Sequence, residues 1–167
     1  MESPRSPSAE PAFVLRSPVP GDLGWIIHRQ AVLYANEYDW DASFEILIAG
    51  IVGGFDPVRE QAWVAERHGK IAGSIFLMRG DDPGTAKLRL LYVEPDARGC
   101  GIGQALVEIS IEHARSAGYR RITLWTNDLL TAARKIYERT GFSRIASEPH
   151  HSFGHYLVSE TWVRNLD

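Results

Sequence analysis

Hydrophobic positions recur with two different periods along the chain, and the period changes near residue 60. Before that point helical spacing predicts helices over 22–38 and 41–52, with Asp22 and Asp41 as their N-caps. After it, short alternating segments separated by turn residues are typical of strands. The strands expected in this way cover residues 62–66, 71–78 and 86–93, and a short first strand covers 13–16.

Strands and helices alternate in the second half. A helix over 101–117 ends at Gly118, a strand follows over 121–126, and a helix over 130–140 ends at Gly141. Two closing strands are expected over 142–147 and 156–163. A strand–helix–strand unit normally gives a parallel pair, whereas the flanking hairpins are antiparallel. We therefore expect an α/β (α+β) fold: a mixed, mostly antiparallel twisted sheet of about six to seven strands, with a central βαβ unit and helices on both faces.

A chain of 167 residues is sufficient for one ordinary domain. Residues 1–11 are rich in Ser, Pro and Ala and offer little to bury, so we expect a disordered tail there. Neither an internal repeat nor a composition shift divides the remainder. The sequence therefore predicts a single domain over residues 12–167.

The charge balance argues against a broad nucleic-acid surface, because 18 Lys and Arg residues face 21 Asp and Glu residues. Cys100 is the only cysteine, which excludes an internal disulfide and fits a reducing compartment. The longest apolar run, 46–55, is too short to span a bilayer, and the N-terminus does not resemble a secretory signal. We expect a cytoplasmic protein without a nucleic-acid or membrane partner.

The segment with the clearest chemistry joins the strand over 86–93 to the following helix. Gly99, Gly101 and Gly103 alternate there, and without side chains they let a ligand approach the backbone closely. The start of a helix presents unpaired N–H groups and a partial positive charge, which together suit a phosphate. Arg98 adds a fixed charge. The segment is therefore predicted to bind an anion.

Two other phosphate loops do not fit these residues. A dinucleotide fingerprint requires Gly or Ala where Gln104 or Leu106 stands. A Walker loop requires Ser or Thr after Gly-Lys, but Ile71 follows Gly69-Lys70.

The residues Arg98-Gly99-Cys100-Gly101-Ile102-Gly103 match the R/Q-x-x-G-x-G/A signature, and the chain resembles the GNAT superfamily of acyl-CoA-dependent N-acyltransferases. The segments 91–95, 126–127 and 132–142 also match that family's pattern, so the resemblance covers nearly the whole chain. More narrowly, 34–40 and 152–155 look like the acetyltransferase half of MarR–GNAT fusion proteins.

The resemblance implies acetyl-CoA as co-substrate and assigns roles residue by residue. Main-chain groups of Leu91 and Val93 would pair with the pantetheine arm, Asn127 would hydrogen-bond it, and Tyr137 would protonate the leaving thiolate. The whole set implied to bind the cofactor is Leu91, Val93, Arg98, Gly99, Cys100, Gly101, Ile102, Gly103, Asn127, Ala133 and Tyr137.

The general base is less clear, because Lys87 and Arg89 occupy the positions where many GNAT enzymes place a glutamate. The base stays open: Glu37, at the end of the first helix, is the candidate that we single out as catalytic, and water or a weak base can also take the proton of the amine. The other carboxylates considered for the role are Asp39 and Glu94.

Several further side chains are candidates for the acceptor site. His151 and His155 are considered to face it, and Tyr34, Tyr38, Trp40 and Trp125 are candidates to line an aromatic pocket. His150, His151 and His155 lack an evident fourth ligand, so no metal is predicted.

The predicted function is transfer of an acetyl group from acetyl-CoA to a primary amine, by direct attack in a ternary complex. Balanced charge favours a small molecule or amino acid as the acceptor. Two alternatives remain open, namely protein N-acetylation and a non-catalytic acyl-CoA-binding sensor. A homodimer is also left open.

Overall fold

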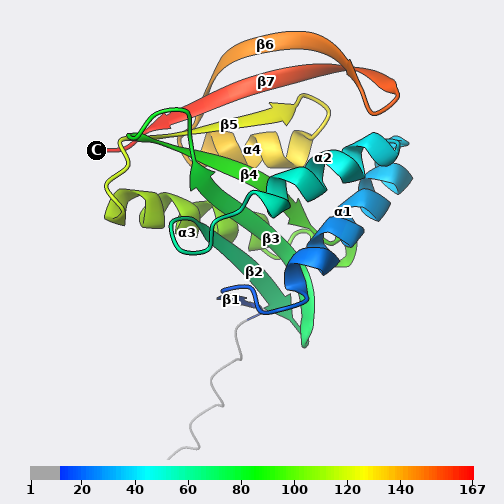
Figure 1. Cartoon of the computed structure of the whole chain (residues 1–167), viewed down its shortest axis with the longest axis horizontal. Coiled ribbons are helices and arrows are strands. Elements are labelled where there is room, and N and C mark those ends of the chain that lie inside the picture. The colour runs from blue at the N-terminus through cyan, green and yellow to red at the C-terminus, as the bar shows by residue number, and fades with distance from the viewer. Residues whose placement is uncertain (1–11) are drawn as a thin grey trace, which may run out of the picture.

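One seven-stranded sheet organises residues 12–167, which are the residues that this computed structural model describes (Figure 1). The tail expected over residues 1–11 lies outside them. The strands lie in the order β1-β2-β3-β4-β5-β7-β6. Their bounds are β1 Val14–Arg16, β2 Gln61–Arg67, β3 Lys70–Arg79, β4 Thr85–Val93, β5 Arg121–Asn127, β6 Ser143–Ser152 and β7 His155–Asn165.

β4 and β5 pair in parallel, and the other neighbouring strands in the sheet pair antiparallel. The prediction of a mixed, mostly antiparallel sheet around a βαβ unit is confirmed. The connecting helices are α1 Asp22–Tyr38, α2 Ala42–Gly53, α3 Ile102–Ser116 and α4 Thr131–Arg139, with a short 3-10 turn η1 at Pro95–Ala97.

The helices cover both faces of the sheet, as expected (Figure 1). α3 and α4 close one face over a core that includes Ile75, Leu88 and Leu106. α1 and α2 close the other over a core that includes Ile26 and Phe76. Because side chains alternate along a strand, each central strand contributes to both cores.

The helix ends correct one prediction. Asp41 caps α2 by accepting a hydrogen bond from the Ser43 amide, as expected. Gly21, with φ 97°, occupies the N-cap of α1 in place of Asp22. Asp22 is instead the first helical residue, and its carboxylate binds Arg16 at 2.7 Å. The assignment of Asp22 as N-cap is therefore wrong.

The hairpin of β6 and β7 is longer than the sequence predicted. β6 continues past residue 147 to Ser152, and seven consecutive residues from its start are exposed. As an edge strand with no buried face it carries no hydrophobic alternation, so its length leaves no pattern in the sequence. The tip of the hairpin turns back toward α1 and α2, where Phe153 packs against Trp40 and Phe44.

Candidate functional site

The centre of the sheet opens where β4 and β5 separate. Their parallel pairing ends at Leu88 and Leu124, although β4 continues to Val93 and β5 to Asn127. A bulge in β4 accompanies the separation, with Leu90 at a φ of 56°. Beyond Leu88, no strand within the described residues 12–167 therefore pairs with the β5-facing edge of β4.

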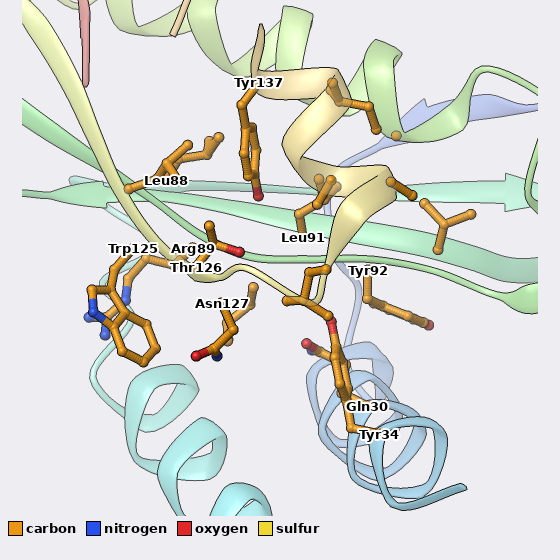
Figure 2. Close-up of a pocket in the computed structure, with 18 of the residues that line it drawn as sticks. Gln30, Tyr34, Leu88, Arg89, Leu91, Tyr92, Trp125, Thr126, Asn127 and Tyr137 are labelled. Carbon is orange, nitrogen blue, oxygen red and sulfur yellow. The ribbon is translucent and has the colours of Figure 1, made fainter. Parts of the chain in front are cut away.

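A cleft of about 1050 Å³ occupies this opening. It is at the upper end of the range of about 300–1,000 Å³ typical of ligand pockets. Side chains from α1, α2, β4, β5 and α4 line it, together with the loop that begins α3. Figure 2 shows Tyr137 entering from one side and Tyr34 and Gln30 from the opposite side. The cleft therefore has two walls that belong to the two faces of the sheet.

The glycine loop forms one end of the cleft. Gly99 and Gly101 have φ values of 81° and 83°, which other residues rarely adopt, and a Cβ on either would meet open space. Gly101 is the N-cap of α3, and no side chain caps that helix. Its first amides are therefore available as donors, which fits the pyrophosphate of acetyl-CoA.

Arg98 and Glu37 form an ion pair at this end of the cleft. The guanidinium donates hydrogen bonds of 2.5 and 3.3 Å to the two carboxylate oxygens. Both residues line the cleft. The pair joins the end of α1 to the glycine loop. Arg98, which is predicted to bind a phosphate, and Glu37, which is predicted to be catalytic, therefore contact each other.

The remaining loop residues differ in their exposure to the cleft. Ile102 and Gly103 line it, and a Cβ on Gly103 would lie 2.7 Å from the Ile136 side chain. Cys100 does not line the cleft; it is half-buried and packs against the core beneath α3. A role for Cys100 in binding could therefore involve only its backbone.

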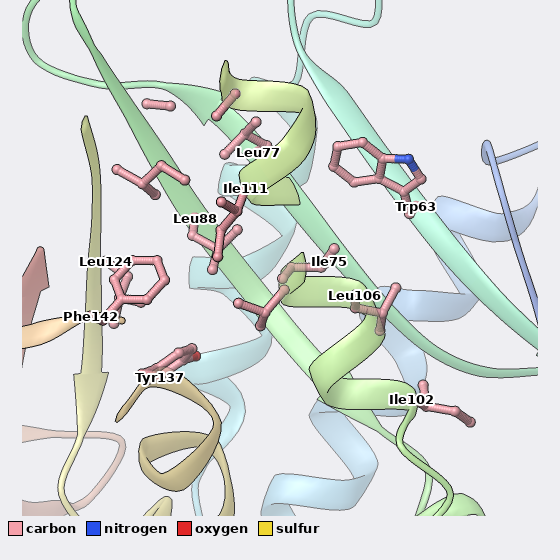
Figure 3. Close-up of a cluster of buried hydrophobic side chains, with 14 of the residues drawn as sticks. Trp63, Ile75, Leu77, Leu88, Ile102, Leu106, Ile111, Leu124, Tyr137 and Phe142 are labelled. Atoms are coloured by element: carbon pink, nitrogen blue, oxygen red, sulfur yellow. The ribbon is translucent and has the colours of Figure 1, made fainter. Parts of the chain in front are cut away.

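Tyr137 lies on α4 at the edge of the core, beside Phe142 and near Leu124 (Figure 3). Its ring is 5.8 Å from that of Phe142, and its side chain is 6% exposed. The hydroxyl points into the cleft (Figure 2). Burial, and to a smaller extent the neighbouring Tyr34, raises the pKa of the Tyr137 phenol above its usual value. Leu91, Val93 and Ala133 also line the cleft.

Asn127 is positioned by a contact that the sequence analysis missed. Its side-chain oxygen lies 2.9 Å from Nε2 of His150, whose Nδ1 lies 2.9 Å from the Ser152 hydroxyl. The amide nitrogen of Asn127 remains for a ligand in the cleft. His150 and Ser152 belong to the part of β6 that hydrophobic alternation did not predict, so no local signal identified this contact.

The aromatic wall expected from the sequence is present. Tyr34, Tyr38, Trp40 and Trp125 all line the cleft. Tyr34 and Trp40 stack at 5.0 Å, and Tyr38 lies 5.6 Å from Trp40. Lys87 and Arg89 line the cleft as well.

Four other candidates lie outside the cleft lining: Asp39, Glu94, His151 and His155. Glu94 is paired with Arg29 of α1 at 2.6 and 2.9 Å. His155 donates a hydrogen bond to the Asp39 carbonyl, and His151 packs on Tyr156. Within residues 12–167, no cluster of three or more metal-ligating side chains occurs.

A mixed sheet whose parallel central strands separate beside a glycine-rich helix start is the GNAT fold. The sequence model of the acetyltransferase (GNAT) family matches residues 27–142. The chain belongs to that family.

Known proteins agree with this placement. Mycothiol acetyltransferase of Cellulomonas flavigena is 30% identical over 155 residues, which cover 86% of this chain and 44% of that protein. The chain spans less than half the length of the first curated relatives that it matches.

Solved structures support the fold. A GNAT-family acetyltransferase from Staphylococcus aureus has a TM-score of 0.77 at 23% identity, over 93% of this chain and 100% of that one. The structure of the Salmonella typhimurium protein yncA with its cofactor acetyl-CoA has a TM-score of 0.72 at 23% identity, over 93% of this chain and 95% of that one. No helix in residues 12–167 is long and apolar enough to cross a membrane.

Proposed function

We propose that this protein transfers an acetyl group from acetyl-CoA to the primary amine of a small molecule or amino acid. The observation that carries the proposal is the cleft between β4 and β5, which runs from an uncapped helix start to a buried tyrosine hydroxyl. The first feature suits a phosphate, and the second can donate a proton. Family membership supports the same chemistry.

Binding of acetyl-CoA would use backbone groups at both ends of the opening. In the proposal, the amides from Arg98 to Gly103 hold the pyrophosphate. The unpaired edge of β4 at Leu91 and Val93 pairs with the pantetheine arm as an added strand would. The free amide of Asn127, oriented by His150, hydrogen-bonds the same arm.

Tyr137 is the proposed general acid. Acetyl-CoA supplies a thioester, which is already activated, so the chain needs no nucleophile of its own. The amine nitrogen forms a bond to the carbonyl carbon, the carbon–sulfur bond breaks, and the Tyr137 hydroxyl gives its proton to the thiolate. The raised pKa of Tyr137 keeps this phenol protonated at neutral pH.

Glu37 is the proposed base for the amine proton. Both of its oxygens accept hydrogen bonds from Arg98, so a base role requires that pair to open. In the proposal Arg98 turns to the pyrophosphate when acetyl-CoA binds, and this releases Glu37. Water is the alternative acceptor of this proton. An amine that arrives protonated loses one proton before it attacks and a second as the amide forms, and the second replaces the proton that Tyr137 gives to the thiolate.

The Tyr137→Phe variant tests the acid role. We expect its kcat, measured by thiol release with a panel of amines, to fall by about 100-fold or more. Its dissociation constant for acetyl-CoA, measured by calorimetry, should stay within about twofold. Tyr156→Phe is the matched control, since Tyr156 is 90% exposed and outside the cleft. A Tyr137→Phe variant with wild-type kcat at every pH would exclude the role.

The same assays separate the proposal from its alternatives. Binding of acetyl-CoA without turnover of any amine would indicate an acyl-CoA-binding sensor, and turnover restricted to peptides would indicate protein acetylation. The single domain over 12–167, the cytoplasmic location, the homodimer and the likeness to MarR–GNAT fusions stay predictions.

A further inference from the structure

Arg89 places a cation inside the cleft, on the side away from Tyr137. It lies on β4 opposite Phe76, which belongs to the core beneath α1 and α2. Its neighbour Leu88 belongs to the core beneath α3. By the alternation of side chains Arg89 therefore faces the α1–α2 side. Figure 2 shows it extending past Trp125 at one end of the cleft.

The guanidinium of Arg89 has no partner among residues 12–167. No carboxylate lies within 4 Å of it, and its side chain donates no hydrogen bond. Other partly buried arginines differ: Arg29 and Arg134 each bind a carboxylate through two nitrogens. Lys87, two residues earlier on the strand, also has no ion pair within the described part of the chain.

The charged groups around Arg89 do not neutralise it. Burial acts most strongly and lowers the pKa of Arg89, while Asp81 and Glu60 raise it from farther away. The Glu60 carboxylate is already engaged by the backbone amides of Asp56 and Arg79. Asp81 is exposed and lines the cleft, as Lys87 does. Neither carboxylate forms an ion pair with Arg89 among residues 12–167.

An unpaired, partly desolvated guanidinium is costly, and an anion that enters the cleft would offset that cost. The planar fork of an arginine matches a carboxylate through two hydrogen bonds. Trp125 lies beside it, and Tyr34, Tyr38 and Trp40 add apolar surface elsewhere in the same cleft. We propose that Arg89 binds the carboxylate of the acceptor, which is therefore an amino acid with an apolar or aromatic side chain. This inference rests on the proposed function.

The position of Arg89 fits such an acceptor. Arg89 precedes Leu91 by two residues, a span of at most about 6–7 Å in a regular strand, and the bulge at Leu90 lies between them. The amine of an α-amino acid is separated from its carboxylate by one carbon. A carboxylate held by Arg89 therefore leaves the amine close to the part of β4 where the thioester is proposed to lie.

The test compares acceptors that differ only in the carboxylate, namely phenylalanine, phenylalaninamide and phenylethylamine. We expect kcat/KM to be about 10- to 100-fold higher for phenylalanine, mostly through KM, as for a hydrogen-bonded charge. Arg89→Gln should remove this preference, so that kcat/KM becomes similar for the three acceptors. Arg115→Gln, an exposed arginine on α3 outside the cleft, is the matched control and should retain it.

Calorimetry with the reaction product makes the test independent of turnover. N-acetylphenylalanine should bind the wild type at least about 10-fold more tightly than its amide does, and Arg89→Gln should abolish that difference. If the product binds in this way but no amine is acetylated, the carboxylate site stands and the proposed function fails. If amines are acetylated but acid and amide bind equally well, the function stands and the assignment of Arg89 is overturned.

Discussion

Glu160 on β7 joins three elements around the helix that carries Tyr137. Its side chain is 1% exposed, and it binds Arg134 of α4 at 2.7 and 3.1 Å and Arg144 of β6 at 2.9 Å. The Trp162 indole donates a further hydrogen bond of 3.2 Å. Arg134 lies three residues before Tyr137, so this ion pair anchors the turn of α4 beside the proposed acid.

The Glu160→Gln substitution should therefore reduce stability substantially. Removing one partner of a buried ion pair costs about 3–5 kcal/mol. Arg134 and Arg144 are 29% and 51% exposed, so both can turn toward water when the charge is lost. We expect the lower end of the range, about 3 kcal/mol, which for a chain of this length lowers Tm by about 6–12 °C.

The pH dependence supplies a second measurement. Burial alone would raise the pKa of Glu160, but hydrogen bonds from Arg144, Arg134 and Trp162 outweigh it and lower the pKa below the usual 4.5. The carboxylate therefore stabilises the fold above pH 4.5, and this contribution is lost as the pH falls through the lowered value. The difference in the free energy of unfolding between the wild type and Glu160→Gln should be constant from pH 6 to 8 and shrink below pH 4.5.

Urea unfolding followed by circular dichroism at several pH values measures both quantities. Glu112 is an exposed carboxylate on α3 that forms no ion pair with any residue that the structure describes. Glu112→Gln is therefore the control, and its free energy of unfolding should stay within about 0.5 kcal/mol of that of the wild type. A Glu160→Gln variant as stable as that control at pH 7 would refute the reasoning. So would a difference that grows as the pH falls.

Two further substitutions test the orientation of Asn127 in the cleft and the packing of β3 against β4. His150→Ala removes the group that orients the Asn127 amide, so we expect KM for acetyl-CoA to rise several-fold with little change in kcat. His151→Ala is the control, because His151 packs on Tyr156 outside the cleft. Equal KM values for the two variants would contradict the positioning role of His150. Gly73→Ala would place a Cβ 2.6 Å from the Tyr92 carbonyl oxygen, so β4 must shift away from β3. The free energy of unfolding in urea should fall by about 1–3 kcal/mol. An unchanged urea midpoint would contradict the close packing of the two strands.

Local patterns in the sequence were sufficient for the fold class and for the glycine-rich turn that begins α3. The helical and strand periods identified the helices and the central strands, because an element with one buried face repeats its apolar residues at a fixed spacing. Gly101 and Gly118 marked the start and the end of a helix. Each has a positive φ, which glycine adopts readily, so the residue type at a single position was sufficient to indicate the turn. The first half of β6 was predicted as a strand, but its continuation from residue 148 to Ser152 was not, because it belongs to an edge strand with exposed residues.

Tertiary structure decided which side chains meet at the site. Arg98 and Glu37 are 61 residues apart, and Asn127 and His150 are 23 apart, so strand order and register bring them together. In the sequence Arg89 was evident only as a residue at a position where a glutamate was expected. That its guanidinium pairs with no carboxylate among residues 12–167 could be known only from the positions of the surrounding charges. The cleft exists because β4 and β5 stop pairing after Leu88, and that separation depends on long-range packing that no local period encodes.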